Sequence, residues 1–456
     1  MRLCIDGTTS PSQTLPTGSS APANRPEDRK LTTARWSVAK LLRLLGPGLL
    51  TGAADDDPSG IATYSQSGAQ FGYALCWVML LATPFMVAIQ IVSARIGSVT
   101  GRGLAANLSK VLPPVALGGL VVLVVAANIF NIVADFAAMA AAVGLLVGGP
   151  APVYALGFGV LCLTAEILIS YRTYAKFLKV LTFVLFAYVA TAFSIRVPWG
   201  QVAAATLIPH ISWSRDQILM LVAVLGTTIS PYLFFWQASL EVEERRIKQN
   251  KKEATLKINN RLAKQRFQPI VIDTWAGMAL SNIIGFFIIV ATAATLHAHG
   301  TSTIGTAADA AEALRPLAGP FAFLLFSVGI IGTGLLAIPA LAGSAAYAIA
   351  ETFGWKNSLG LPPTRARGFY FIVGGSTLLG AIGAMTRLDP IRMLVWSAVL
   401  NGIVAVPLMV MMMLLITNSR IMGNFIASRM LAIFGWLATL LMSAAVTVFF
   451  LSSITD

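Results

Sequence analysis

Charged residues are scarce in this chain. They make up 11% of its 456 residues, whereas 56% are hydrophobic. A water-soluble globule needs more charge than this, and here the apolar runs recur from one end of the chain to the other. The composition therefore excludes a soluble protein and predicts an all-α integral membrane protein that crosses the bilayer many times.

Cysteine and histidine are also rare, with three of each. The cysteines are Cys4, Cys76 and Cys162, and they have neither metal-ligand spacing nor an evident pairing. The histidines are expected in loops or at loop edges, too isolated for a metal site. The chain also lacks a Ser/His/Asp constellation, a zinc motif and a phosphate-cradling glycine loop. An enzyme is therefore the least favoured class, and no cofactor is predicted.

Apolar runs long enough to cross a bilayer are plentiful. A span needs about 20 mostly apolar residues, and on that criterion we expect eleven spans. They cover about 46–71, 73–95, 114–146, 152–170, 177–195, 217–240, 270–296, 318–350, 367–385, 391–416 and 430–452.

Lysine and arginine follow a membrane topology. With a cytoplasmic N-terminus and eleven spans, the inside segments hold 27 of these residues and the outside segments hold 5. This distribution predicts a C-terminus outside, in a bacterial inner membrane. It also indicates that the net charge of +13 reflects contact with the lipid bilayer and not binding of nucleic acid.

Residues 1–35 have no apolar segment of a secretory signal and are expected to be a disordered cytoplasmic tail.

Three consecutive carboxylates interrupt the first apolar run, at Asp55-Asp56-Asp57-Pro58-Ser59-Gly60. A carboxylate in hydrocarbon costs roughly 2.5 to 3.5 kcal/mol on insertion scales, so acids there usually face water or a bound cation. Pro58 removes a backbone donor and Gly60 is a poor helix former, so this helix is expected to unwind.

A second interruption lies in the sixth span, at Gly226-Thr227-Thr228-Ile229-Ser230-Pro231-Tyr232. Spans one and six are each the first span of a five-helix half of the chain. Because five is an odd number, the two halves have opposite orientations in the membrane. This is the arrangement of transporters built from inverted repeats, whose sites lie where the interrupted helices meet. We expect a transporter domain at 36–452, with repeats at about 46–197 and 215–417 and an eleventh helix at about 430–452. The alternative is two ordinary proline kinks.

Oxygen donors dominate both interruptions. Asp57, the hydroxyl of Ser230 and the backbone carbonyls freed around Thr227 are hard ligands, which suit Mg²⁺, Ca²⁺ or Mn²⁺. No His, Cys or Met lies within either interruption.

At these residues the chain resembles the Nramp family of divalent-metal transporters. The resemblance covers most of the membrane region and rests on five blocks. They are Gly46-Pro47-Gly48, Asp57-Pro58-Ser59-Gly60 with Ala62-Thr63, Gln90 with Ala94-Arg95-Ile96-Gly97 and Thr100-Gly101, Ala134-Asp135-Phe136-Ala137, and Ser230-Pro231-Tyr232. The resemblance implies a LeuT-type fold with helices 1 and 6 unwound, and alternating access around one metal site.

Four positions depart from the family pattern. Gly60 replaces the asparagine of the first motif, and Ser230 replaces the methionine whose thioether favours transition metals. Tyr232 replaces a histidine, and Ala138 stands where an acid is expected three positions after Asp135; both missing groups are tied to the family's proton route. These departures are similar to those of the Nramp-related magnesium transporters. The resemblance to this branch implies transport of Mg²⁺ and Mn²⁺ without coupled protons.

The residues fall into three groups of candidates for the metal site. Asp57 is the expected direct ligand. Ser230 and the Thr227 carbonyl would bind the ion directly or through water, and Gly60 would contribute space and a carbonyl. Asp55 or Asp56 would attract the ion or bind it in another conformation; the alternative is a helix-interior carboxylate paired with an Arg or a backbone donor.

More distant groups complete the prediction. Gln90 and Asn401 could face the ion path, although interhelical hydrogen bonding is the commoner use of such amides. Asp135 and Glu166 are intramembrane acids with either a functional or a structural role. Tyr232 and Trp236 are expected to pack and exclude water.

The resulting prediction is a transporter of Mg²⁺, Mn²⁺ or both, without proton coupling and with no obligate protein partner. Two alternatives stay open. One is a proton-coupled Mn²⁺ or Fe²⁺ importer that uses Asp56, Asp135 or Glu166. The other is a LeuT-like carrier of organic solutes, for which three acids beside the site would be unfavourable.

Overall fold

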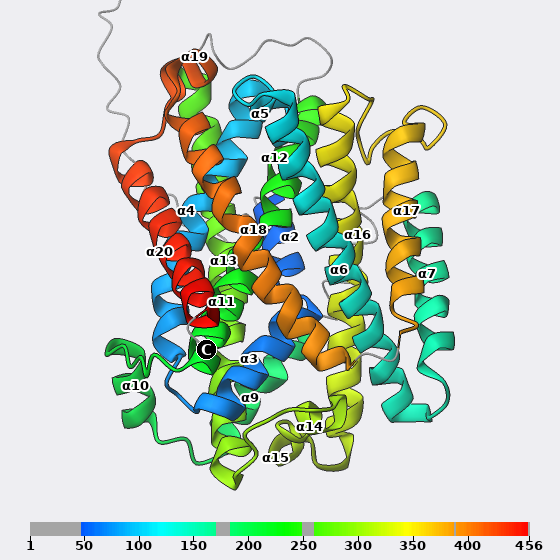
Figure 1. The fold of residues 1–456 in the computed structure, drawn as a ribbon, viewed down its shortest axis with the longest axis vertical. Coiled ribbons are helices and arrows are strands. Elements are labelled where there is room, and N and C mark those ends of the chain that lie inside the picture. Colours follow the sequence, from blue (N-terminus) through cyan, green and yellow to red (C-terminus); the bar gives the residue numbers. More distant parts are fainter. Residues whose placement is uncertain (1–46, 170–182, 249–259, 387–388, 455–456) are drawn as a thin grey trace, which may run out of the picture. The chain divides into compact units, whose positions relative to one another are not determined.

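The computed structural model describes residues 47–169, 183–248, 260–386 and 389–454. Every regular element in these ranges is helical (Figure 1). The predicted tail at 1–35 lies outside the described residues.

The helices follow one another with short connections. The α-helices are α2 (Pro47–Asp55), α3 (Pro58–Phe71), α4 (Cys76–Thr100), α5 (Leu104–Leu108), α6 (Pro114–Val147), α7 (Ala151–Leu168), α9 (Phe186–Ser194), α10 (Trp199–Leu207), α11 (Arg215–Thr228), α12 (Pro231–Lys248), α13 (Asn260–Thr295), α14 (Ala307–Glu312), α15 (Arg315–Ala318), α16 (Ala322–Thr352), α17 (Arg367–Gly383), α18 (Pro390–Thr417), α19 (Ser419–Met422) and α20 (Arg429–Ile454). Four short 3₁₀ turns accompany them, η1 (Phe183–Leu185), η3 (His297–His299), η4 (Gly319–Phe321) and η5 (Gly423–Phe425).

Eight of the eleven predicted spans correspond to described helical segments long and apolar enough to cross a membrane. The other three differ for separate reasons. The first is divided into α2 and α3, the ninth is α17 with 17 residues, and the fifth begins before the described residues resume at Phe183. The fifth also continues past α9 into α10 with a bend of 118°, which turns α10 away from the line of the span.

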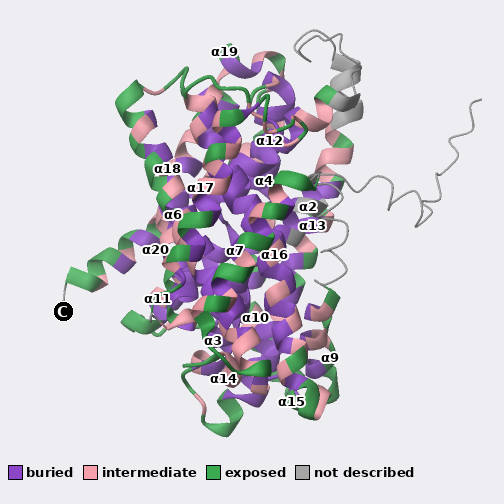
Figure 2. Cartoon of the chain, turned by 90° about the vertical axis from the view of Figure 1, so that its right-hand side faces the viewer, coloured by how far each residue is buried: buried purple, intermediate pink, exposed green. Residues whose placement is uncertain are grey.

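Burial separates central helices from peripheral ones. In the most apolar window of Arg215–Arg246, which contains both α11 and α12, 89% of residues are buried, against 22% in α7. Figure 2 shows the buried residues concentrated within the helix bundle and the last turns of α20 exposed. The sixth span therefore lies at the centre of the bundle, where an ion would be shielded from lipid.

Small residues bring the central helices into backbone contact. A Cβ at Gly52 of α2 would lie 2.4 Å from the backbone of Gly277 in α13, and one at Gly226 of α11 would lie 2.1 Å from the Ala398 carbonyl oxygen in α18. Such close approach is the usual way in which helices pack in a bilayer, where dispersion replaces the hydrophobic effect. It fixes α2 against α13 and α11 against α18.

Candidate metal site

The first span breaks as predicted, between Asp55 at the end of α2 and Pro58 at the start of α3. Asp57 is the N-cap of α3, and its Oδ1 accepts hydrogen bonds from the Ser59 hydroxyl (2.6 Å) and the Gly60 amide (2.8 Å). A carboxylate at this position satisfies backbone donors that no helical carbonyl can reach. One carboxylate oxygen of Asp57 therefore supports the helix, which leaves Oδ2 for another partner.

The sixth span breaks between Thr228, where α11 ends, and Pro231, where α12 begins. Pro231 has no N–H to continue the ladder, so the carbonyls before it lose their helical partner. The Ser230 hydroxyl donates to the carbonyl oxygens of Thr227 (2.8 Å) and Gly226 (3.1 Å). Each carbonyl oxygen keeps a second lone pair, which could still bind an ion.

The two breaks face one another. A Cβ at Gly60 would lie 3.2 Å from Thr227 Oγ1 and 3.6 Å from Asp57 Oδ1. The Tyr232 hydroxyl lies 2.8 Å from the Ala54 carbonyl oxygen and 3.5 Å from Asp57 Oδ2. Asp57, Gly60, Thr227 and Tyr232 therefore surround one small region between the broken helices.

Two acids beside Asp57 turn toward a different helix. The Ser281 hydroxyl of α13 lies 2.8 Å from Asp55 Oδ2 and 2.8 Å from Asp56 Oδ1. Among the described residues no Lys or Arg pairs with the three carboxylates of this cluster. Asp55 and Asp56 therefore share one hydroxyl partner, and Asp56 adds a carboxylate next to Asp57.

Several buried polar atoms of the candidate residues, and of Asn131 one helical turn before Asp135, have no hydrogen-bond partner. They are Thr227 Oγ1, Gln90 Oε1, both carboxylate oxygens of Asp135, and both amide atoms of Asn131 and Asn401. Buried polar groups are normally satisfied, so each unpaired atom calls for a water, an ion or a rearrangement. Asp135 is completely buried in α6 and lies within electrostatic range of Asp57 and Tyr232.

The remaining candidates lie outside this group of contacts. Glu166 of α7 accepts hydrogen bonds from Thr377 of α17 at 3.0 and 3.2 Å. Gln90 of α4 and Asn401 of α18 are buried, and neither forms a hydrogen bond with Asp57. Of the histidines, His297 lies 2.9 Å from the Ala69 carbonyl oxygen through Nδ1.

Sequence reasoning missed three features of this region. Asp57 is a helix cap as well as a candidate ligand, and the signal was available, since Asp followed by Pro is a common helix start. Tyr232 does more than pack, because its hydroxyl reaches Ala54. Ser281 gave no signal, because its contact with Asp56 spans 225 residues of sequence.

The chemistry of the site follows from its atoms. No three His, Cys, Asp or Glu side chains converge as metal ligands in the part of the chain that the structure describes. A cation here would be bound by the Asp57 carboxylate together with backbone and hydroxyl oxygens. Such a donor set suits a hard divalent ion that keeps part of its hydration shell.

Comparison with known proteins relates the chain to transporters of divalent metals. It is 27% identical over 419 residues to the divalent metal cation transporter MntH of Deinococcus radiodurans, covering 91% of this chain and 90% of that protein. It is also 27% identical over 438 residues to the MntH of Caldanaerobacter subterraneus, covering 90% of this chain and 96% of that protein.

Solved structures share the fold. A mutant of the manganese transporter of Eremococcus coleocola matches with a TM-score of 0.72 and 18% identity, covering 92% of this chain and 87% of that one. Mhp1, a nucleobase-cation-symport-1 family transporter, matches with a TM-score of 0.52 and 16% identity, covering 90% and 93%. These likenesses confirm the predicted LeuT-type fold, in which helices 1 and 6 are unwound.

The family assignment rests on most of the chain. The sequence model of the family described as "Natural resistance-associated macrophage protein-like" matches residues 48–452. That range contains both broken helices and the candidate metal site. The chain therefore belongs to the Nramp family.

Proposed function

We propose that this protein carries Mg²⁺, Mn²⁺ or both across the membrane by alternating access, without coupled protons. The observation that carries the proposal is the buried carboxylate of Asp57 at one helix break, placed opposite Thr227 at the other. The relatives' descriptions as divalent metal cation and manganese transporters support the class of substrate.

The proposed ligands are oxygen atoms from both breaks. Asp57 Oδ2 binds the ion directly, since Oδ1 is engaged by Ser59 and Gly60. Thr227 contributes its carbonyl and its unpartnered hydroxyl, and Ser230 contributes through a retained water. Gly60 leaves the space that this water needs. Because all of these donors are hard, the site does not discriminate strongly against Mg²⁺.

A polar wall surrounds the direct ligands in this proposal. Asp56 and Asp135 supply negative charge without binding the ion, and Gln90 and Asn401 supply amide groups along its path. The carboxylate oxygens of Asp135 and the amide atoms of Asn131, one helical turn earlier, are all unpartnered. Ordered water bound to these groups would hydrate an approaching ion.

The membrane potential would drive uptake without protons. A dication entering the cell gains roughly 4.6 kcal/mol per 100 mV. The residue that follows Pro231 is a tyrosine, and its hydroxyl is already engaged with Ala54. A histidine here could take up and release protons near neutral pH, whereas the tyrosine does not.

Proton-coupled import of Mn²⁺ or Fe²⁺ is the second candidate function. The observation that favours it is Asp135, a buried acid near Asp57 whose carboxylate oxygens have no partner. Glu166 favours it less, because Thr377 satisfies it between α7 and α17. Simultaneous measurement of metal and proton flux distinguishes the two functions.

Alternating access requires two groups of helices that move past each other. We propose that residues 46–197 and 215–417 are the two inverted repeats and that α20 is the additional helix. The N-terminus would be cytoplasmic and the C-terminus outside, as the distribution of basic residues indicates. The bacterial relatives support a location in a bacterial inner membrane. The burial of Asp57 then corresponds to a state in which the site is closed to both sides.

Metal binding by the purified protein tests the proposal. Free Mn²⁺ gives a six-line electron paramagnetic resonance signal that weakens when the ion is bound, and excess Mg²⁺ should restore it by competition. We expect Asp57→Asn to weaken binding at least 100-fold. Glu166→Gln is the matched control, because it neutralises another buried intramembrane acid and should bind normally. Equal binding by wild type and Asp57→Asn would refute the assignment of the ligand.

A further inference from the structure

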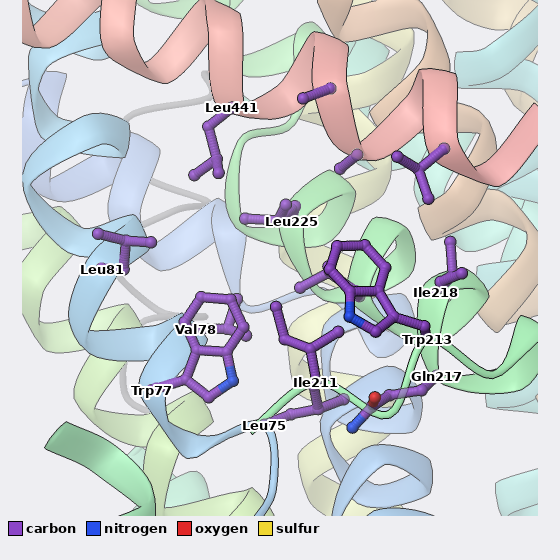
Figure 3. A pocket seen from close by; sticks show the side chains of 14 residues that line it. Leu75, Trp77, Val78, Leu81, Ile211, Trp213, Gln217, Ile218, Leu225 and Leu441 are labelled. Carbon is purple, nitrogen blue, oxygen red and sulfur yellow. The ribbon is translucent and has the colours of Figure 1, made fainter. Parts of the chain in front are cut away.

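An apolar cavity lies between the beginning of α4, α11 with the loop before it, and the C-terminal half of α20. It has a volume of about 160 Å³, and thirteen of its 14 lining side chains are aliphatic or indole groups (Figure 3). In the view of Figure 3, Trp77 and Gln217 lie at the end of the cavity opposite Leu441. Its chemistry therefore suits an apolar ligand and differs from that of the metal site.

The only lining side chain of another kind, Gln217, is occupied by the protein itself. Its Oε1 accepts hydrogen bonds from the amide (2.5 Å) and hydroxyl (2.8 Å) of Ser212, and its Nε2 donates to the His210 carbonyl at 3.4 Å. Gln217 thus holds the loop before α11 in place. Its amide is therefore not free to bind a ligand in the cavity.

Trp77 supplies a buried donor without a partner, whereas the other indole of the wall, Trp213, is 66% exposed. The Trp77 side chain is 7% exposed, and its indole N–H has no hydrogen-bond partner. Figure 3 shows the indole nitrogen on the side of the ring that faces Ile211, another lining residue. An unpaired buried donor is unfavourable, so a ligand that brings one acceptor to this point gains from the contact.

Trp213 lies beside the same cavity in an unusual backbone conformation. Its φ of 55° is the one positive value at a non-glycine residue in the described ranges. Such strain persists only where the surroundings hold it in place, and here the Gln217 contacts fix the loop.

Trp77 and Trp213 both lie close to helix ends, where tryptophans mark the level of lipid head groups and ester groups.

The wall of the cavity reaches the surface that faces lipid. The lining residue Leu81 is itself 37% exposed, and the neighbouring Leu80 on α4 and Leu440 on α20 are 53% and 62% exposed. In a protein that spans the bilayer, exposed leucines on α4 and α20 contact acyl chains. A ligand can therefore enter from the bilayer without crossing water.

We propose that this cavity binds one acyl chain of an ester-linked membrane phospholipid, whose ester carbonyl accepts a hydrogen bond from the Trp77 indole N–H. The apolar wall matches the chain, and the buried Trp77 donor matches the carbonyl acceptor at its head-group end. Leu225 in the cavity wall lies two residues before Thr227 on α11. The bound chain therefore packs against the half-helix that leads to the second break.

Native mass spectrometry of the full-length protein tests this proposal. The probes are two synthetic phospholipids with the same head group and chains, one ester-linked and one ether-linked, because an ether lacks the carbonyl acceptor. We expect the wild type to retain one ester-linked lipid and to prefer it about five-fold over the ether-linked lipid, as one hydrogen bond would give. Trp77→Phe keeps the ring and removes the donor, so it should abolish the preference.

A variant that fills the cavity provides the second arm. Ala445→Trp, at a lining residue, should lose the retained lipid, whereas Leu440→Trp, on the adjacent surface, should keep it. Lipid retention by Ala445→Trp, or an unchanged preference in Trp77→Phe, would overturn the proposal. A dimer that dissociates in Ala445→Trp would instead assign the cavity to a second copy of the chain. None of these outcomes depends on the metal.

Discussion

The phenol of Tyr232 donates a hydrogen bond of 2.8 Å to the backbone carbonyl of Ala54. Tyr232 lies in the first turn of α12 and Ala54 in the last turn of α2, so the bond joins the two broken helices directly across the candidate site. The break in the first span would otherwise leave this carbonyl without a partner. A cation that used this carbonyl oxygen as a further ligand would have to share it with the phenol or displace the phenol.

Tyr232→Phe should therefore destabilise the metal-free protein. Loss of the hydroxyl leaves a buried carbonyl unpaired, which costs about 1–3 kcal/mol. Added Mn²⁺ or Mg²⁺ should raise the melting temperature of the variant more than that of the wild type, because the freed carbonyl can bind the ion. Thermal unfolding with and without metal measures both effects.

Tyr370→Phe is the control for this experiment. It also removes a bond from a phenol to a carbonyl, at 3.0 Å from the Leu361 oxygen and away from the site. It should destabilise the protein without changing the metal-induced shift. If both variants respond to metal alike, the Ala54 carbonyl is not a ligand.

Gly60 and Thr227 should be energetically coupled. A Cβ at Gly60 would lie 3.2 Å from Thr227 Oγ1, so Gly60→Ala crowds the hydroxyl and should weaken metal binding by about 1 kcal/mol, a factor of about five. Thr227→Ala removes the crowded atom. In the double variant the penalty of Gly60→Ala should therefore disappear, and simple additivity of the two changes would exclude the proposed contact.

Ser230→Met should change the choice of metal. A thioether is a soft ligand that favours Cd²⁺ and other soft ions over Mg²⁺. We expect the ratio of Cd²⁺ to Mg²⁺ uptake to rise on the order of ten-fold, whereas Ser230→Ala should lower both rates without changing their ratio. An unchanged ratio in Ser230→Met would show that this side chain does not face the ion.

Asp135→Asn should weaken metal affinity, because a bound cation favours the ionised form of this carboxylate and an amide cannot carry that charge. Asp135 lies within electrostatic range of Asp57, and its carboxylate oxygens are unpartnered. We expect the Mg²⁺ concentration at half-maximal uptake to rise about ten-fold, with the maximal rate largely kept. Glu166→Gln, which removes a distant acid, should leave both parameters unchanged. A lost maximal rate in Asp135→Asn would favour the proton-coupled alternative.

The sequence predicted the breaks because their causes are local. Pro58 and Pro231 each end a hydrogen-bond ladder at a defined residue, and the structure divides the spans at those points. The small residues beside these two prolines also indicated that neither segment forms a regular apolar helix. The predicted positions of the unwound helices 1 and 6 are therefore confirmed.

Contacts between distant segments could not be read in the same way. The partner of Asp55 and Asp56 is Ser281, one of many serines in the chain, and only the packing of α13 against α2 selects it. For Thr227 the carbonyl was the predicted ligand, whereas the unpartnered hydroxyl is a second candidate that depends on the rotamer. The bend between α9 and α10 was not predicted, although Pro198 lies at it and is a local signal of the same kind.

The most direct test of the central claim is uptake of Mg²⁺ and Mn²⁺ into proteoliposomes with internal pH recorded at the same time. The account predicts that both metals enter, that an inside-negative potential accelerates entry, that internal pH stays constant, and that Asp57→Ala abolishes uptake. Exclusion of Mg²⁺ together with acidification during Mn²⁺ entry would contradict it.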